Sequence, residues 1–266
     1  DLTFKMKIIN SEKYIKKNLK KIVKKPFHFT ILDNFLDRKF INKIYKEFPS
    51  YKDSIWHEYS NYCENKKTLN IWNLFKPNTY KLFSYLNSQE FIDKMQNNFT
   101  QKKIFSDDGL HGGGLSIMRD NVGKLNPHLD NSVHPKSGLL RKYNLILFLN
   151  KNWKKNMGGC LNFYEKNKNA ENIPGILSKT IVPIFNRCVI FDTSMNSWHG
   201  VQQITKRKKL YRRSIQIYYF VKENSIKRKR FKVLYAPDDK QKKNKKVLDF
   251  IKIRSSNKTF QKVYKT

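Results

Sequence analysis

The sequence predicts an α+β fold with a mainly β core, a barrel or jelly roll, and N-terminal helices packed outside it. Two observations predict this fold. Up to about Gly109, helical stretches dominate, whereas short apolar or alternating runs follow, separated by Gly, Pro, Asn and Asp. No stretch of about 10–15 residues with helical periodicity lies between these runs, which argues against parallel βαβ units.

The chain of 266 residues suits one large domain, or one domain with extensions. Hydrophobic residues make up 39% of it and aromatic residues 14%, so a core rich in Phe and Tyr can form. We expect a basic N-terminal helix or extension over residues 1–25, a barrel domain over 26–222 and a basic C-terminal extension over 223–266.

The N-terminal elements follow from apolar spacing and capping residues. Residues 1–25 read as a Lys-rich amphipathic helix that Pro26 ends, and a short strand is expected over 27–32. Asp37 suits the N-cap of a helix ending near Phe48. Residues 50–73 are expected to be irregular, and residues 78–99 to be helical.

The β core is predicted from the short runs in the second half of the chain. They cover residues 115–119, 143–149, 160–164, 180–185, 187–192 and 214–221. Apolar residues scattered between 247 and 253 predict a closing helix or strand. The short strands at this spacing favour an antiparallel barrel over an open parallel sheet.

The charge of the chain is strongly positive. Lys and Arg number 55 against 21 Asp and Glu, a formal charge of +34. Such a surface attracts polyanions. Two interpretations stay open: an anionic macromolecular partner bound through the basic extensions, or the Lys- and Asn-rich composition that AT-rich genomes favour.

The cysteines and the hydropathy of the chain bear on its location. Three cysteines without CxxC spacing predict neither a disulfide framework nor a structural zinc site, so a cytoplasmic location is expected. No apolar run approaches the ~18 residues of a membrane span.

The segment Pro127-His128-Leu129-Asp130 carries the most specific chemistry. Residues two apart in a strand point to the same side, so His128 and Asp130 can offer an imidazole and a carboxylate to one ion. His199 follows after enough chain for several strands, so a barrel can return it beside the pair. Two His and one carboxylate, with coordination positions left open, form the ligand set of non-haem Fe(II) oxygenases.

A second pattern lies in the run that follows His199. Arg212, Ser214 and Gln216 alternate with Arg213 and two isoleucines, which puts the first three on one side of a strand. An Arg inside a barrel needs an anion, and its guanidinium pairs with a carboxylate through two parallel hydrogen bonds. The distal carboxylate of 2-oxoglutarate suits Arg212 assisted by Ser214, and Arg213 is the alternative if the register differs.

These residues resemble the 2-oxoglutarate- and Fe(II)-dependent dioxygenases of the prolyl 4-hydroxylase-like superfamily. The resemblance covers roughly residues 27–221, and it includes the HxD pair, the distal His and the downstream Arg. The segments that also resemble the family are 110–115, 134–135, 144–150, 158–159 and 185–191. The 13 residues from His199 to Arg212 exceed the separation in many relatives, and the basic loop 206–209 accounts for them.

The resemblance implies a double-stranded β-helix with N-terminal helices, in which His128, Asp130 and His199 bind Fe(II) and Arg212 binds 2-oxoglutarate. It implies O₂ as co-substrate and succinate and CO₂ as products; ascorbate is a supportive cofactor in this interpretation. The expected substrate is a prolyl residue or a prolyl-like small molecule. A sugar, lipid precursor or nucleobase is the alternative within the same chemistry.

Further residues are candidates for the cofactor and substrate pockets. Tyr143 and Gln216 are predicted to assist cofactor binding, although Tyr143 equally suits the core. His111, His134 and Asn144 are candidates for substrate contact. A different class of function also stays open, in which a basic nucleic-acid-binding module keeps a vestigial site.

Overall fold

The computed structural model describes residues 7–130, 133–170, 172–205, 209–222, 232–256, 258–259 and 262. The helices are α1 (Glu12–Leu19), α2 (Arg38–Glu47), α3 (Pro77–Asn87), α4 (Gln89–Asn98) and α5 (Lys245–Ser255), with 3-10 turns η1 (Trp72–Leu74) and η2 (Lys155–Met157). The strands are β1 (Phe29–Leu32), β2 (His57–Ser60), β3 (Glu64–Leu69), β4 (Gly114–Arg119), β5 (Lys124–Leu129), β6 (Leu140–Phe148), β7 (Leu161–Lys166), β8 (Pro174–Ile181), β9 (Cys188–Asp192), β10 (His199–Val201), β11 (Tyr211–Val221) and β12 (Leu234–Tyr235).

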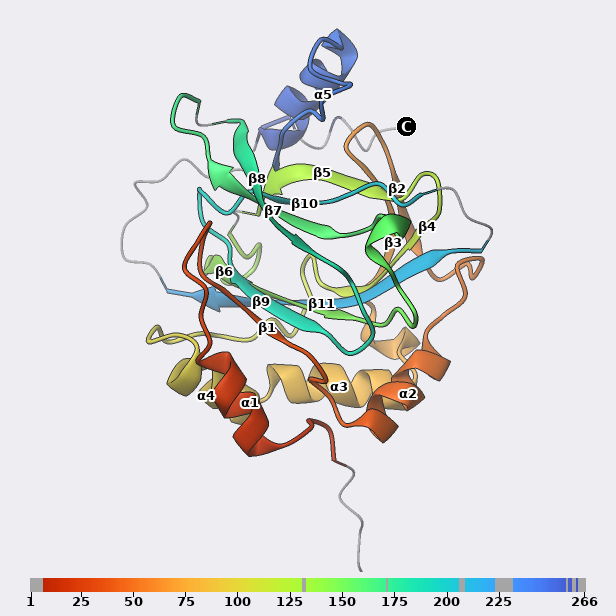
Figure 1. Cartoon of the computed structure of the whole chain (residues 1–266), viewed down its shortest axis with the longest axis vertical. Helices are drawn as coiled ribbons and strands as arrows, with labels where there is room; N and C mark the ends of the chain where they lie inside the picture. Colours follow the sequence, from red (N-terminus) through yellow and green to blue (C-terminus); the bar gives the residue numbers. More distant parts are fainter. Residues whose placement is uncertain are drawn as a thin grey trace, which may run out of the picture.

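The strands form one antiparallel sheet that folds over itself into two layers (Figure 1). One layer runs β1-β9-β6-β11-β4, and the other runs β5-β10-β7-β8. Strand β3 joins them, because it pairs with β4 on one side and with β5 on the other. This is the double-stranded β-helix that the sequence predicted, and the prediction of an α+β fold with a mainly β core is confirmed.

Aromatic side chains fill the space between the two layers. Phe163 of β7 lies 5.2 Å from the ring of Phe29 in β1 and 5.1 Å from that of Phe191 in β9. All three side chains are buried. Burying each such side chain stabilises the fold by roughly 1.5–3 kcal/mol, so these contacts hold the layers face to face.

Helices α1 to α4 cover the outer face of the layer that contains β6 and β11 (Figure 1). In β6 from Tyr143 on and in β11 up to Tyr219, odd-numbered residues point outward into this helix-covered core, among them Leu145, Leu147, Ile215 and Ile217. Even-numbered residues of the same stretches point into the barrel. This alternation places Arg212, Ser214 and Gln216 inside, as the sequence predicted.

The predicted helices differ from the observed ones mainly at their ends. Asp37 caps α2 by accepting hydrogen bonds from the backbone N–H groups of Lys39 and Phe40, as expected. The helix expected over 78–99 is divided at Ser88, whose side chain caps α4. Helix α1 covers only Glu12–Leu19 of the stretch expected over 1–25, and residues 1–6 lie outside the described residues.

Two segments were predicted wrongly. Residues 50–73, expected to be irregular, contain β2 and β3. Their sequences are polar on both faces, so they lack the apolar alternation that marks a strand. The strand expected at 180–185 is β8, which begins earlier, at Pro174.

The segment after residue 231 packs on the barrel. Strand β12 pairs with β5, so that Leu234 lies opposite Leu129 and Tyr235 opposite His128. Helix α5 buries Val247 and Ile251 in a cluster with Cys63 and Tyr235. The division of the chain into a domain and two extensions stays a prediction, and Lys227–Arg230 of the expected basic extension lie outside the described residues. Among the described residues, no helix has the length and apolar character that crossing a membrane would need.

Candidate metal centre and its pockets

Strands β5 and β10 bring together the three side chains of the HxD…H pattern. His199 lies directly opposite His128 in the antiparallel pair, and their rings are 4.2 Å apart. Asp130 follows the last residue of β5, and its two carboxylate oxygens lie 3.6 Å from Nε2 of His128 and 3.4 Å from Nε2 of His199. We call these three residues the β5–β10 triad. Their ligand atoms all lie within 4.8 Å of one another, and all three side chains are buried.

The second nitrogen of each imidazole in the triad is held by a backbone carbonyl. Nδ1 of His128 lies 2.9 Å from the carbonyl oxygen of Asn126, and Nδ1 of His199 lies 2.8 Å from that of Ser197. Each Nδ1–H therefore donates to a carbonyl oxygen, which leaves each Nε2, the nitrogen on the carboxylate side, as the atom that a metal ion could use. Burial, and secondarily the neighbouring His199, lower the pKa of His128 to about 3, so this ring is neutral at physiological pH.

The Asp130 carboxylate is fixed by groups that favour its charged form. Its Oδ2 accepts a hydrogen bond of 2.7 Å from the hydroxyl of Tyr218, and a guanidinium nitrogen of Arg141 lies 3.9 Å from Oδ1. Burial alone would raise the pKa of this carboxyl, but the contact with His199 and the nearby His128 hold that pKa well below its usual range. Two imidazoles and one carboxylate could thus hold one divalent ion and leave other coordination positions open.

Arg212 points into the barrel beside the triad. It is 2% exposed, its Nε donates to the carbonyl oxygen of Gly159 at 2.7 Å, and its guanidinium lies 5.0 Å from the ring centroid of Phe148. Burial lowers its pKa to about 10, so the side chain stays charged at neutral pH. Within the described residues, no Asp or Glu forms an ion pair with it.

A narrow cavity connects Arg212 with the triad. Its lining includes His128, His199, Arg212, Ser214 and Gln216. A buried cation in this place can hold the carboxylate of a ligand that also reaches the metal position. The geometry fits the expected anchoring of 2-oxoglutarate, with Ser214 at hand on the same face of β11.

Arg213 lies on the opposite face of β11. Its guanidinium packs over the rings of Tyr45 and Phe48 on the helix-covered side, at 5.6 and 6.0 Å from their centroids. The register that the sequence left open therefore directs Arg212 inward and Arg213 outward.

Two neighbouring residues of β6 point to opposite faces. The hydroxyl of Tyr143 lies 2.7 Å from that of Thr100, and its ring packs on Phe99 in the helix-covered core. Tyr143 therefore does not line the cavity, contrary to the expectation that it assists cofactor binding. Asn144 faces the interior, fully buried, and neither polar atom of its amide has a hydrogen-bond partner among the described residues.

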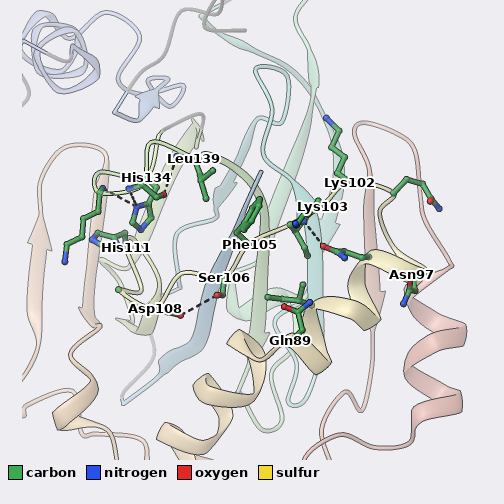
Figure 2. Close-up of a pocket in the computed structure, with 17 residues that line it drawn as sticks. Gln89, Asn97, Lys102, Lys103, Phe105, Ser106, Asp108, His111, His134 and Leu139 are labelled. Carbon is green, nitrogen blue, oxygen red and sulfur yellow. Dashed lines mark hydrogen bonds between the residues drawn. The ribbon is translucent and has the colours of Figure 1, made fainter. Parts of the chain in front are cut away.

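The other candidate histidines form a second group with a buried carboxylate. Nδ1 of His111 and Nε2 of His134 lie 3.0 and 3.2 Å from the same oxygen of Asp107. We call these residues the Asp107 triad. These two histidines line a groove of about 1020 Å³. Figure 2 shows His111 and His134 at one end of this groove and Lys102 and Lys103 at the other. His111 also lines the cleft above the β5–β10 triad, so the two hollows are neighbours.

Sequence reasoning missed several residues of the site. Tyr218 was not singled out, although it shares the inward face of β11 with Arg212. Arg141 was also missed. It lies on β6, the strand that follows His128 and Asp130 in the chain, and its guanidinium lies 3.9 Å from the Tyr218 ring centroid. The ring of Tyr235 lies 5.5 Å from that of His128. Its position so far along the chain gave no local signal of this contact.

Comparison with known protein families supports the interpretation of the site. The family described as the 2OG-Fe(II) oxygenase superfamily matches residues 113–220, a segment that contains the β5–β10 triad and Arg212. Fold, triad and family match together define a non-haem Fe(II) oxygenase architecture. Residues 113–220 of the chain are thus similar to the 2OG-Fe(II) oxygenase superfamily, for which Fe(II) and 2-oxoglutarate are the implied cofactors.

Two curated proteins match short segments of the chain. A prolyl 3-hydroxylase from Xenopus laevis is 36% identical over 64 residues, which cover 24% of this chain and 12% of that protein. A β-galactosidase from Thermoanaerobacterium thermosulfurigenes is 32% identical over 74 residues, which cover 27% of this chain and 10% of that protein. The chain thus spans about a tenth of the length of these relatives.

Among solved structures, the fold is similar to that of a prolyl hydroxylase from Trichoplax adhaerens. That protein was solved in complex with a peptide fragment of the hypoxia inducible factor oxygen degradation domain. The TM-score is 0.55 and the identity 19%, and the match covers 73% of this chain and 83% of that one. At this identity, the likeness shows the fold.

Proposed function

We propose that this protein is a 2-oxoglutarate- and O₂-dependent Fe(II) hydroxylase that acts on a prolyl residue or a prolyl-like small molecule. One observation carries the reaction class: the β5–β10 triad converges on one point beside the inward, buried Arg212. The proposed substrate is supported by similarity to two prolyl-hydroxylating proteins, the prolyl 3-hydroxylase and the prolyl hydroxylase described above.

The protein residues have separate tasks in this reaction. The triad holds the metal, and Arg212 with Ser214 holds the distal carboxylate of 2-oxoglutarate. Bound Fe(II) supplies the activation of O₂ that the side chains cannot provide. One oxygen atom of O₂ enters the substrate C–H bond as a hydroxyl group, and the other enters succinate as 2-oxoglutarate loses CO₂.

The structure also suits the exclusion of water from the metal position. The triad is buried between the layers, and the ring of Phe191 packs 4.8 Å from that of His199. An apolar wall around the ligands strengthens the electrostatic contacts that orient the co-substrate. Gln216 and Tyr218 provide polar groups on the remaining side.

Succinate formation from 2-oxoglutarate tests the proposal. We expect the Fe(II)-loaded protein to form succinate, and N-acetyl-L-proline or a proline-containing peptide to increase the rate. Replacing Arg212 with Ala should raise the KM for 2-oxoglutarate by about 10- to 100-fold, the usual effect of losing a hydrogen-bonded charge pair.

Arg213→Ala is the matched control, because its side chain lies on the other face of the same strand. It should leave the KM for 2-oxoglutarate within about twofold, since outward surface-side changes are usually small. If Arg213→Ala raised this KM and Arg212→Ala did not, the assignment of the anchor would be overturned. Absence of any succinate from the iron-loaded protein would overturn the hydroxylase itself.

A further inference from the structure

The cleft above the β5–β10 triad has one wall made by the β2–β3 hairpin. Alternate residues of the two strands line this wall, and none is aliphatic: they are His57, Tyr59, Glu64, Lys66 and Thr68. Tyr235 and Val233, from the segment before α5, also line the cleft. Its volume of about 380 Å³ lies at the small end of the range for small-molecule sites.

Lys66 occupies a particular position in this wall. It lines both the outer cleft and the narrow cavity that contains Arg212. Its ammonium lies 3.0 Å from a carboxylate oxygen of Glu64 and 5.2 Å from the ring centroid of Tyr59. Its side chain is 21% exposed, whereas that of Glu64 is 2% exposed. The buried Glu64 therefore holds the Lys66 ammonium in place, while the partly exposed Lys66 side chain still faces the cleft.

The surroundings keep this ammonium charged. Burial works against the charge, but Glu64, together with Tyr59 and Asp130, raises the pKa of Lys66 above its ordinary value. An ammonium has three N–H donors, more than one carboxylate oxygen can use. A buried ion pair is not needed for stability, since well-packed apolar side chains often serve as well. Binding of an anionic ligand by Lys66 would explain why the Lys66–Glu64 ion pair lies in the wall of the cleft.

We propose that Lys66 binds a carboxylate of the primary substrate and so holds the substrate in the cleft above the β5–β10 triad. This inference rests on the proposed function of the β5–β10 triad. Arg212 and the metal already account for the two carboxylates of 2-oxoglutarate. Arg141, Lys232 and Arg254 also line the outer cleft, but Lys66 is the one of these four cations that also lines the narrow cavity beside the triad, so we assign Lys66 to the substrate. The substrate class is therefore a prolyl-like molecule with a free carboxylate, rather than a prolyl residue flanked by neutral peptide bonds.

The experiment compares two probes that differ only in this group, N-acetyl-L-proline and N-acetyl-L-prolinamide. Their affinities are measured by calorimetry on the protein loaded with Ni(II) and 2-oxoglutarate, which requires no turnover. Wild-type protein should bind the carboxylate probe at least about 10-fold more tightly than the amide, as expected for a charge-assisted contact.

Replacing Lys66 alone would remove the main counter-charge of the buried Glu64, which endangers folding. The test variant is therefore Lys66→Met combined with Glu64→Gln, which removes both charges together. It should lose the preference for the carboxylate probe while keeping its affinity for 2-oxoglutarate. Lys67→Met is the matched control: Lys67 lies on the other face of β3, 4.4 Å from the Tyr51 ring centroid, so this variant should keep the preference.

Several outcomes would overturn the proposal. They are equal affinity of the wild type for both probes, no measurable binding of either, and a preference that survives in the double variant. A double variant that loses 2-oxoglutarate binding instead would assign Lys66 to the co-substrate. Failure of succinate formation would count against the hydroxylase, while the calorimetric comparison would still decide the role of Lys66.

Discussion

The two triads of this protein have the same composition, two histidines and one aspartate, and different chemistry. In both, potential ligand atoms lie within 4.8 Å of one another, and the aspartate is buried. They differ in what the remote nitrogens of the histidines contact. In the β5–β10 triad both Nδ1 atoms face carbonyl oxygens, which leaves both Nε2 lone pairs for a metal.

In the Asp107 triad, Nδ1 of one histidine accepts hydrogen bonds instead of donating them. Nδ1 of His134 accepts from the backbone N–H groups of Lys136 and Ser137, at 3.2 and 3.0 Å. Its proton therefore lies on Nε2, where it is donated to Asp107, and the ring has no lone pair left for a metal. The Asp107 carboxylate also accepts from the backbone N–H groups of Gly109 and His111. The hydrogen bonds between the histidine nitrogens and the backbone, more than the residue types, thus distinguish a metal site from a hydrogen-bonded cluster that only stabilises the fold.

The largest difference between the two triads should appear when one histidine is removed from each. His128→Ala takes away one of three ligands, so we expect loss of stoichiometric Fe(II) binding and of succinate formation. His134→Ala should keep one equivalent of metal per chain, because that ring has no free lone pair. Calorimetric titration with Fe(II) under anaerobic conditions measures both.

Tryptophan fluorescence and thermal unfolding of the two variants serve as controls for folding. A wild-type protein that binds two equivalents of metal, one of which disappears in His134→Ala, would show that the Asp107 triad is a metal site. In that case the assignment of its protons would be wrong.

Replacing Asp107 with Asn should produce a smaller effect, on stability alone. The amide keeps the shape of the side chain but turns one acceptor into a donor, which then faces N–H groups of Gly109 or His111. Leaving buried donors unsatisfied costs about 1–3 kcal/mol. We expect the free energy of unfolding in urea to fall by this amount, while the metal stoichiometry of the folded protein stays unchanged.

An exposed carboxylate provides the matched control for this variant. Asp239→Asn changes a side chain that is 92% exposed, and it should alter the free energy of unfolding by less than about 0.5 kcal/mol. Equal effects of the two substitutions would show that the hydrogen bonds around Asp107 do not stabilise the fold.

The β5–β10 triad was largely predictable from sequence because strand alternation fixes which side chains share a face. That rule put His128 and Asp130 on one face and left Arg213 as the alternative to Arg212, while the resemblance to the dioxygenases implied their roles. The same rule should have separated Tyr143 from Asn144, since adjacent residues of a strand cannot both line one cavity. The assignment of Tyr143 overlooked this.

The walls of the cleft were not predictable in the same way. The β2–β3 hairpin is polar on both faces, because one face lines the cleft and the other is half exposed, so it carries no hydrophobic signal. Tyr235 reaches His128 only through the pairing of β12 with β5, between residues more than 100 positions apart. Such contacts depend on tertiary packing that a single sequence does not encode locally.

The smallest expected effect concerns the pH dependence of the metal-free protein. The pKa of His128 is lowered to about 3 in the folded state, whereas an unfolded histidine titrates near 6.5. The unfolded chain therefore binds more protons below pH 6.5, and the free energy of unfolding falls as the pH falls. Between pH 7 and pH 6 this one group contributes a loss of about 0.7 kcal/mol. Urea unfolding at the two pH values, for wild type and His128→Gln, isolates it: the variant should show the shallower dependence. If the free energy of unfolding of the variant depended on pH as steeply as that of the wild type, or more steeply, His128 would not be held neutral in the folded protein. Its Nε2 would then not be available to a metal at neutral pH, as the contrast between the two triads requires.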